Sequence, residues 1–284
     1  MKRFLLLLVA FVAIVAVVLY FRRVARPDVP FAKHSTPAMD FARLEHTLPL
    51  SVEDRMTLQP QHMATLTQEE VDQIYGRLTA GPIPDGAFDG DLVFPRGADG
   101  ETRLGEIIPG RLKARFANFA VRKTEFLGRT LWKGKVFYRQ ARLLRNRIDD
   151  LSVLKPILGD NTAGIEKISV AGKDAYLLFP AKLYCGQSLL DGRRESVIID
   201  YSFTDELPGY RAEPDSLGGR DGLRIRDEIR MVRPGFYLGR AYLNRIFGLN
   251  FTLYNAQQAD AGAADFRAGK VAEDCWVGTQ RAQR

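Results

Sequence analysis

Residues 247–254, Phe-Gly-Leu-Asn-Phe-Thr-Leu-Tyr, decide the fold class of this chain. Large apolar side chains occupy every second position, so Phe247, Leu249, Phe251 and Leu253 point to one face of an extended backbone. A period of two over such a run is typical of a β-strand with one buried face. Residues 223–232 and 236–243 form similar runs immediately upstream, so we expect consecutive strands in this part of the chain.

The segments between such runs contain the residues of tight turns. Asp-Gly dipeptides lie at 85–86, 99–100, 191–192 and 221–222, and Ala-Gly-Lys-Asp at 171–174 resembles a hairpin tip. Further strand-like runs lie at 88–94, 136–144, 165–170, 175–179, 183–190 and 197–201. Many short antiparallel strands favour a sandwich or a barrel, and a preceding helix favours the barrel. We predict a mainly β fold, an antiparallel barrel of about eight strands.

One helix is predicted immediately before the first strand. Thr67 and Glu70 have the spacing of a capping box, and Val71, Ile74 and Leu78 share one helical face. The Gly-Pro pair at 81–82 is expected to end this helix. We expect it to cap the barrel.

The chain is predicted to have four parts. Residues 1–26 are an anchor with basic flanks, and residues 27–66, with prolines at 27, 30, 37, 49 and 60, are an extended tether. Residues 67–255 hold the helix and the barrel, and residues 256–284 form a polar tail.

The anchor is predicted from residues 4–21, an uncharged run rich in Leu, Val, Ala and Phe. As a helix it would span roughly 27 Å, about the thickness of the hydrocarbon core of a bilayer. A cleaved signal peptide is the alternative, but Tyr20, Phe21 and Arg22 stand where small residues would be needed. We expect a single-pass inner-membrane protein with its domain in the periplasm, although basic residues on both sides of the run leave its orientation nearly balanced.

The two cysteines, Cys185 and Cys275, bear on the same question. An oxidising compartment would allow them to form one disulfide, and two buried free thiols are the alternative. The sequence leaves both open.

The composition, with 46% hydrophobic and 26% charged residues in 284, is globular and excludes disordered and fibrous classes. The net charge of +7 is unevenly distributed, because residues 111–147 alone carry +11 and residues 1–26 carry +5. We expect the basic segment 111–147 to be a solvated face or a surface for anionic lipid. Its candidate contact residues are Arg111, Lys113, Arg115, Arg122 and Lys123. No nucleic-acid partner is expected, since no nucleic-acid-binding motif accompanies the charge.

Motifs of catalysis, metal binding and cofactor binding are not recognised. His34, His46 and His62 are too widely spaced for a metal site, and residues 128–135 lack the spacing of a phosphate loop. We therefore expect no metal and no cofactor, and a non-enzymatic protein is favoured.

Asp227 is the main candidate for a functional residue. It interrupts the apolar face formed by Ile225, Ile229 and Met231, and an inward carboxylate must find a partner or take up a proton. It could orient a ligand or act as an acid or base, and a structural ion pair is the alternative. Asp200 is the second catalytic candidate, and Tyr201, Arg240 and Trp132 are further candidate ligand-binding residues.

Three motifs resemble an uncharacterised bacterial membrane-anchored family. They are Asp-Tyr-Ser at 200–202, Arg-Asp-Glu-Ile-Arg at 226–230 and Pro-Gly-Phe-Tyr-Leu-Gly at 234–239, with residues 132–137 fitting the same pattern. This resemblance covers about residues 67–254 and implies no activity. More loosely, the pattern looks like a lipocalin-like (calycin) barrel, with Phe88 where the usual Gly-x-Trp motif has tryptophan.

The predicted function is that of a membrane-anchored β-barrel that binds an apolar or amphipathic small molecule such as a lipid. An enzyme that acts on such a ligand through Asp227 or Asp200 is one alternative. The other is a non-catalytic scaffold that docks on a membrane or an acidic partner through residues 111–147. The sequence does not indicate an oligomeric state.

Overall fold

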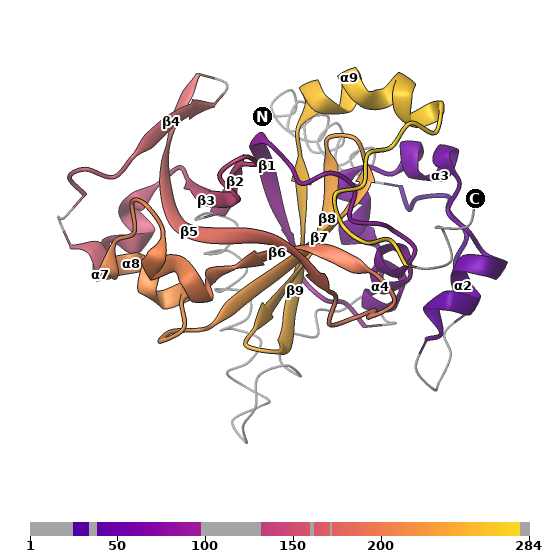
Figure 1. Ribbon diagram of the computed structural model, residues 1–284, viewed down its shortest axis with the longest axis horizontal. Helices are drawn as coiled ribbons and strands as arrows, with labels where there is room; N and C mark the ends of the chain where they lie inside the picture. The colour runs from indigo at the N-terminus through magenta and orange to yellow at the C-terminus, as the bar shows by residue number, and fades with distance from the viewer. Residues whose placement is uncertain (1–24, 34–38, 98–131, 160–161, 171, 279–284) are drawn as a thin grey trace, which may run out of the picture.

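In the structure, a computed structural model that describes residues 25–33, 39–97, 132–159, 162–170 and 172–278, eight antiparallel strands close into a barrel (Figure 1). The strands follow the order β3-β2-β1-β9-β8-β7-β6-β5, and β5 pairs with β3 to complete the ring. They are β1 (Gly86–Val93), β2 (Trp132–Tyr138), β3 (Leu143–Ile148), β5 (Lys173–Gln187), β6 (Glu195–Asp200), β7 (Ile225–Arg233), β8 (Phe236–Leu243) and β9 (Ile246–Tyr254). A short strand, β4 (Lys167–Val170), forms a hairpin with β5 beside the ring. The predicted mainly β barrel is confirmed.

Short helices surround this barrel. Figure 1 shows α2, α3 and α4 on one side, α7 and α8 on the other, and α9 near the end opposite the β8–β9 hairpin. The helices are α2 (Phe41–Thr47), α3 (Val52–Thr57), η1 (Pro60–Thr65), α4 (Gln68–Gly76), η2 (Leu151–Leu154), α7 (Lys155–Leu158), η3 (Tyr201–Glu206), α8 (Ala212–Asp215), η4 (Ser216–Gly218) and α9 (Ala256–Arg267).

The predicted strands agree with the structure in the last part of the barrel and differ in its middle. β8 occupies the predicted residues, and β7 and β9 begin and end within two residues of them. The run 136–144 belongs to two strands, because the chain reverses between β2 and β3 with Arg142 at φ 53°. The runs 175–179 and 183–190 belong to the single strand β5, which continues past Pro180.

One half of the barrel lumen is filled with apolar side chains. The ring of Phe88 lies edge-on to the rings of Phe137 and Tyr237, with centroids 5.6 Å and 5.8 Å away. Around them pack buried residues of β3, β5, β6, β7 and β9: Leu144, Ala181, Leu183, Val197, Ile199, Ile229, Met231 and Leu253. This half lies toward the end at which β7 finishes and β8 begins, and it forms the main hydrophobic core.

The helix α4 covers the outer wall of the barrel. Its predicted capping box of Thr67 and Glu70 is confirmed, but the helix ends at Gly76, before the expected stop at 81–82. Val71 and Ile74 are buried in a second core with Leu238 on β8. The helix therefore lies against the outward-facing side chains of β7 and β8, and the expectation that it caps the barrel is corrected.

Much of the predicted tether also packs on this wall. Within residues 27–66, the structure contains α2, α3 and η1, and Leu58 and Met63 are completely buried in the same core. Ser51 and Asp54 form a capping box at α3, and Pro60 opens η1, where its missing N–H group has no consequence. The prolines that suggested an extended tether instead separate short helices, so this prediction is corrected for Phe41–Thr65.

The predicted membrane anchor falls almost wholly outside the described residues. Residues 4–21 are not among them, and no helix in the described ranges is long and apolar enough to cross a bilayer. The anchor remains a prediction from the sequence.

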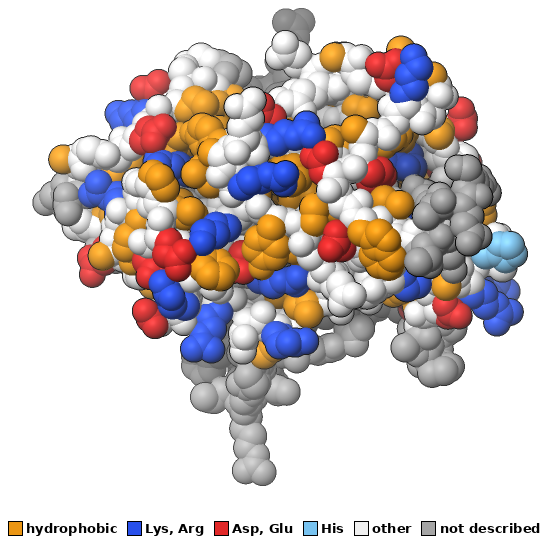
Figure 2. Space-filling model, viewed as in Figure 1, with side chains coloured by type: hydrophobic (Ala, Val, Ile, Leu, Met, Phe, Trp, Pro, Cys, Tyr) orange, Lys and Arg blue, Asp and Glu red, His pale blue; other side chains and the backbone are white. Residues whose placement is uncertain are grey.

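The basic segment 111–147 is described from residue 132 onward. There Arg145 pairs with Glu166 at 2.6 Å and Arg147 pairs with Asp89 at 2.7 Å. On the face drawn in Figure 2, basic and acidic side chains are interspersed among apolar ones. The described part of the segment is thus an ion-paired part of the barrel wall. The candidate contact residues Arg111, Lys113, Arg115, Arg122 and Lys123 lie outside the described residues.

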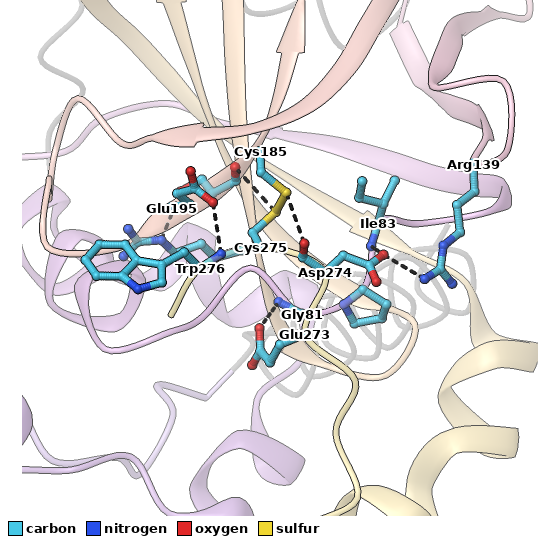
Figure 3. The surroundings of a disulfide bond; sticks show 12 residues. Gly81, Ile83, Arg139, Cys185, Glu195, Glu273, Asp274, Cys275 and Trp276 are labelled. Atoms are coloured by element: carbon cyan, nitrogen blue, oxygen red, sulfur yellow. Dashed lines mark hydrogen bonds and ion pairs between the residues drawn. A yellow bond between two sulfur atoms is a disulfide. The ribbon is translucent and has the colours of Figure 1, made fainter. Parts of the chain in front are cut away.

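The expected polar tail closes the filled end of the barrel. α9 buries Phe266, and the guanidinium of Arg55 lies 4.7 Å from the centroid of that ring. Beyond α9, Cys275 forms a disulfide with Cys185 on β5 (Figure 3). The carboxylate of Asp274, beside it, accepts hydrogen bonds from the backbone N–H of Ile83 and from Arg139. The C-terminal segment is therefore held on the barrel by a covalent bond and by several hydrogen bonds.

Candidate functional site

The other half of the lumen is hollow. A cavity of about 500 Å³ opens at the end where β6 and β8 finish and β7 and β9 begin. Its walls are mostly apolar and include Leu92, Phe179, Leu223, Ile225, Leu249 and Phe251. Cavities of roughly 300–1,000 Å³ with apolar walls are typical of small-molecule sites.

Two aromatic rings form part of the cavity lining and lie across the lumen. Trp132 and Phe251 meet edge to face, with centroids 5.6 Å apart. Glycines make room for them: a Cβ atom at Gly90 would lie 2.3 Å from the indole, and one at Gly239 would lie 2.2 Å from the phenyl ring. These strands therefore need glycine where the rings cross the barrel.

A buried polar cluster is also part of this lining. Lys135 on β2 places its ammonium 3.0 Å from the carboxylate of Asp227 on β7. The same ammonium donates to the hydroxyl of Tyr201 at 2.6 Å and to the amide oxygen of Asn146 at 2.9 Å. Both charged side chains are at least nine-tenths buried, so each depends on these partners in place of water.

A β-bulge on β2 separates two side chains that both reach the lumen, Trp132 and Lys135. The register between β2 and β3 shifts between Trp132 and Gly134, so Trp132 and Lys135 both face inward although they are three residues apart. Gly134 has φ 137°, and a Cβ atom there would lie 2.0 Å from the carbonyl oxygen of Phe88. Only glycine fits this position. Lys135 shares the inward face with Phe137, two residues further along the strand, and without the bulge Trp132 would face outward.

The electrostatics of the cluster favour a charged lysine and a neutral tyrosine. Burial alone would lower the pKa of Lys135, but Tyr201 and Asp227 together raise it above its ordinary value. Burial raises the pKa of Tyr201 despite the nearby ammonium. Burial also raises the pKa of Asp227, with a further contribution from the nearby carboxylate of Glu228, against the attraction of Lys135.

Aromatic rings further stabilise the ammonium. The Nζ atom of Lys135 lies 5.4 Å from the ring centroids of Trp132 and Phe251 and 5.2 Å from that of Tyr201. Desolvated contacts of this kind contribute on the order of 1–2 kcal/mol each. The lysine is thus held in place by three acceptors and three ring faces.

Three of the predicted site residues meet at the cavity, and two do not. Asp227, Tyr201 and Trp132 all line it. Asp200 instead accepts a hydrogen bond from the hydroxyl of Tyr184 at 2.6 Å and caps η3 through the N–H of Ser202. Arg240 lies on the outer wall, where it pairs with Asp72 of α4 and with the hydroxyl of Tyr242. Ile199 and Ala241, the neighbours of Asp200 and Arg240 on their strands, face the lumen. Because faces alternate along a strand, Asp200 and Arg240 face outward.

Two further residues of the cluster, Lys135 and Asn146, were not predicted from the sequence. Lys135 lies in a segment dense in basic residues, where a solvated face was the expectation. The available signal was Phe137, because residues two apart on a strand share a face. Asn146 carries no comparable signal, since its neighbours Arg145 and Arg147 suggest an exposed strand.

A second buried charge cluster lies on the outer wall, beneath α4. Arg230 of β7 is completely buried and bonds to Asp191, to the hydroxyl of Ser196 and to backbone carbonyls of Tyr75, Asp191 and Arg194. Glu228, also completely buried, accepts from the N–H of Leu189 at 2.8 Å and pairs with Arg226. None of the described cavities is lined by Arg230 or Glu228.

A group of metal-ligand types also lies at the disulfide. Cys185, Cys275 and Glu195 have ligand atoms within 4.8 Å of one another. The two sulfur atoms are bonded to each other, and a disulfide lacks the thiolates that bind metals. The carboxylate of Glu195 instead accepts from the N–H of Trp276 (Figure 3).

Comparisons with protein-family models, with curated proteins and with solved structures find no match to this chain. The closed antiparallel barrel is consistent with a lipocalin-like architecture. The resemblance to an uncharacterised bacterial family remains a prediction from its motifs.

Proposed function

We propose that this protein binds one apolar or amphipathic small molecule, such as a lipid, in the hollow half of its barrel. The observation that carries the proposal is the cavity of about 500 Å³, with apolar walls and a polar cluster held at fixed positions among them. Apolar walls supply affinity, since burying apolar surface contributes about 25 cal/mol per Å². The polar cluster would orient the ligand within the barrel.

In the part of the chain that the structure describes, one end of the lumen is open to a ligand. The filled half of the lumen and the C-terminal segment close one end, so a ligand would enter from the end where Leu217 and Leu223 lie. These two side chains are 42% and 53% exposed, which offers a partly apolar rim to an incoming ligand. A ligand would then bind with its polar end inward and its apolar part toward the rim.

A substitution that fills the cavity tests this proposal. Ala241 lines the cavity, so Ala241→Phe should lower the affinity of full-length protein for the apolar dye N-phenylnaphthylamine by about tenfold or more. Ala261→Phe is the matched control, because Ala261 lies on the exposed face of α9. Dye fluorescence measures both. Equal dye affinity in wild type and Ala241→Phe, or no dye binding at all, would refute the proposal.

An enzyme that acts on the bound molecule is the second candidate function. It is favoured by the raised pKa of Asp227, a carboxyl group at the cavity that could exchange a proton with a ligand. In an enzyme, Asp227→Asn would abolish turnover and retain binding. Asp200, the other predicted acid or base, lies outside the cavity lining and drops out of this candidate.

We further propose that the barrel is held at the inner membrane by residues 4–21, with the barrel in the periplasm. The disulfide between Cys185 and Cys275 supports this, since such bonds persist in oxidising compartments. Maleimide labelling of intact protein should therefore require prior reduction and unfolding. Rapid labelling of both cysteines in the native, unreduced protein would contradict the proposed location.

A further inference from the structure

The polar cluster in the lumen has no free side-chain donor. The ammonium of Lys135 has three N–H groups and three acceptors, on Asn146, Tyr201 and Asp227. The amide nitrogen of Asn146 donates to the carbonyl of Phe179 at 3.0 Å and to the hydroxyl of Tyr201 at 2.8 Å. All of these donors are therefore committed to protein acceptors.

The two remaining donors are committed as well. The indole N–H of Trp132 donates to the amide oxygen of Asn146 at 2.8 Å. The hydroxyl of Tyr201 lies 3.3 Å from the same oxygen and 3.5 Å from Oδ2 of Asp227. A ligand that needs a hydrogen-bond donor would have to break one of these bonds.

One acceptor is left over. Both contacts to the carboxylate of Asp227 go to its Oδ2 atom, and no donor among the described residues bonds to Oδ1. Although the side chain of Asp227 is only 6% exposed, its Oδ1 atom is not fully enclosed by protein, and the residue lines the cavity. This oxygen is therefore available to a bound molecule.

Resting on the proposed function, we infer that the ligand is a neutral amphiphile whose polar end donates a hydrogen bond to Asp227, as the hydroxyl of a long-chain or polycyclic alcohol does. Lys135 and Asp227 balance one another, so the cluster has no excess charge for an ionic head group to neutralise. A carboxylate head group would be repelled by the like charge of Asp227, and an ammonium head group would be repelled by that of Lys135. A neutral hydroxyl group is repelled by neither residue.

Four compounds with one chain length test this inference. Dodecanol, dodecanoic acid, dodecylamine and dodecane should each compete with N-phenylnaphthylamine for the full-length protein, and dodecanol should bind about tenfold tighter than the other three. One added hydrogen bond to a charged group corresponds to this difference. Preference for the acid or the amine, or equal affinity for dodecanol and dodecane, overturns the inference while the proposed function stands. No binding of the dye or of any of the four refutes the proposed function itself.

The variant Asp227→Asn makes the test sharper. It replaces the free acceptor by an amide that can donate, and it leaves Lys135 without its counter-charge, so selectivity should change from dodecanol to dodecanoic acid. Leu223→Ala is the matched control, since Leu223 lines the cavity at its rim and should weaken all four compounds alike. If Asp227→Asn does not fold, the ranking of the four compounds on wild-type protein still decides. Unchanged selectivity in a folded Asp227→Asn protein also overturns the inference.

Discussion

Two buried charge clusters lie on opposite faces of the same strand, and they differ in what surrounds them. Asp227 faces the lumen, whereas its neighbours on β7, Glu228 and Arg230, lie beneath α4 on the outer wall. The outer cluster is packed on all sides, and Arg230 makes five hydrogen bonds to protein. The lumen cluster borders a cavity and keeps one acceptor free. Buried charge alone therefore does not mark a binding site, and an adjoining cavity distinguishes the two.

The largest effect is expected from the outer cluster. Arg230→Met removes a buried ion-pair partner of Asp191 and leaves the hydroxyl of Ser196 and the buried carbonyls of Tyr75 and Arg194 without this donor, so it should lower the free energy of unfolding by about 3–5 kcal/mol. Urea denaturation followed by circular dichroism measures this loss. Dye affinity of the folded variant should equal that of wild type. A loss below about 1 kcal/mol would show that the outer cluster does not have the structural role assigned to it.

A smaller loss is expected from the same replacement in the lumen. Lys135→Met leaves Asp227 unpaired, but the raised pKa of that carboxyl and the adjoining cavity allow it to take up a proton or meet water. The free energy of unfolding should fall by about 1–3 kcal/mol, and the ranking of the four dodecyl compounds should change. A loss equal to that of Arg230→Met would mean that the two clusters are energetically alike and would remove the contrast between them.

The strand that carries both clusters could be predicted from the sequence. The residues that join Asp227 in the lumen cluster, Lys135 and Asn146, were not predicted. Period-two alternation placed Asp227 on the inward face of β7 correctly, because a regular strand obeys that period. Lys135 was missed because the many basic residues around it favoured a solvated face, although it is in phase with the inward-facing Phe137. The bulge at Gly134 puts Trp132 out of phase with both. A prediction of partners across a barrel also needs the register of β2 against β1 and β3, which no local pattern specifies.

The outer cluster could not be predicted for a different reason. Alternation puts Arg226, Glu228 and Arg230 on the face of the strand opposite Asp227, and it does not show what covers that face. The cover comes from α4 and from the residues after β5, far away in the sequence. Helix α4 also supplies Asp72, which pairs with Arg240 on the outer wall, away from the cavity.

The smallest expected effect is a pH dependence of the free energy of unfolding that comes from Asp227 in the lumen. Because burial raises the pKa of Asp227, its contribution to stability is complete below its ordinary pKa of 3.8 and is lost as pH rises through the folded-state value. Wild type should therefore lose stability relative to Asp227→Asn as pH increases from about that point. Urea midpoints of the two proteins at a series of pH values measure the difference. A wild type that instead gains stability relative to Asp227→Asn with rising pH would contradict the assigned direction.

Methyl-labelled NMR of the full-length protein during a titration with dodecanol locates the bound alcohol. Chemical-shift changes are expected for the methyl groups of Leu223, Ile225 and Leu249, which line the cavity, and unchanged signals for Ile74 and Leu238 under the outer wall. Shifts confined to the outer-wall methyl groups, or no shifts at saturating dodecanol, would contradict ligand binding in the hollow half of the barrel.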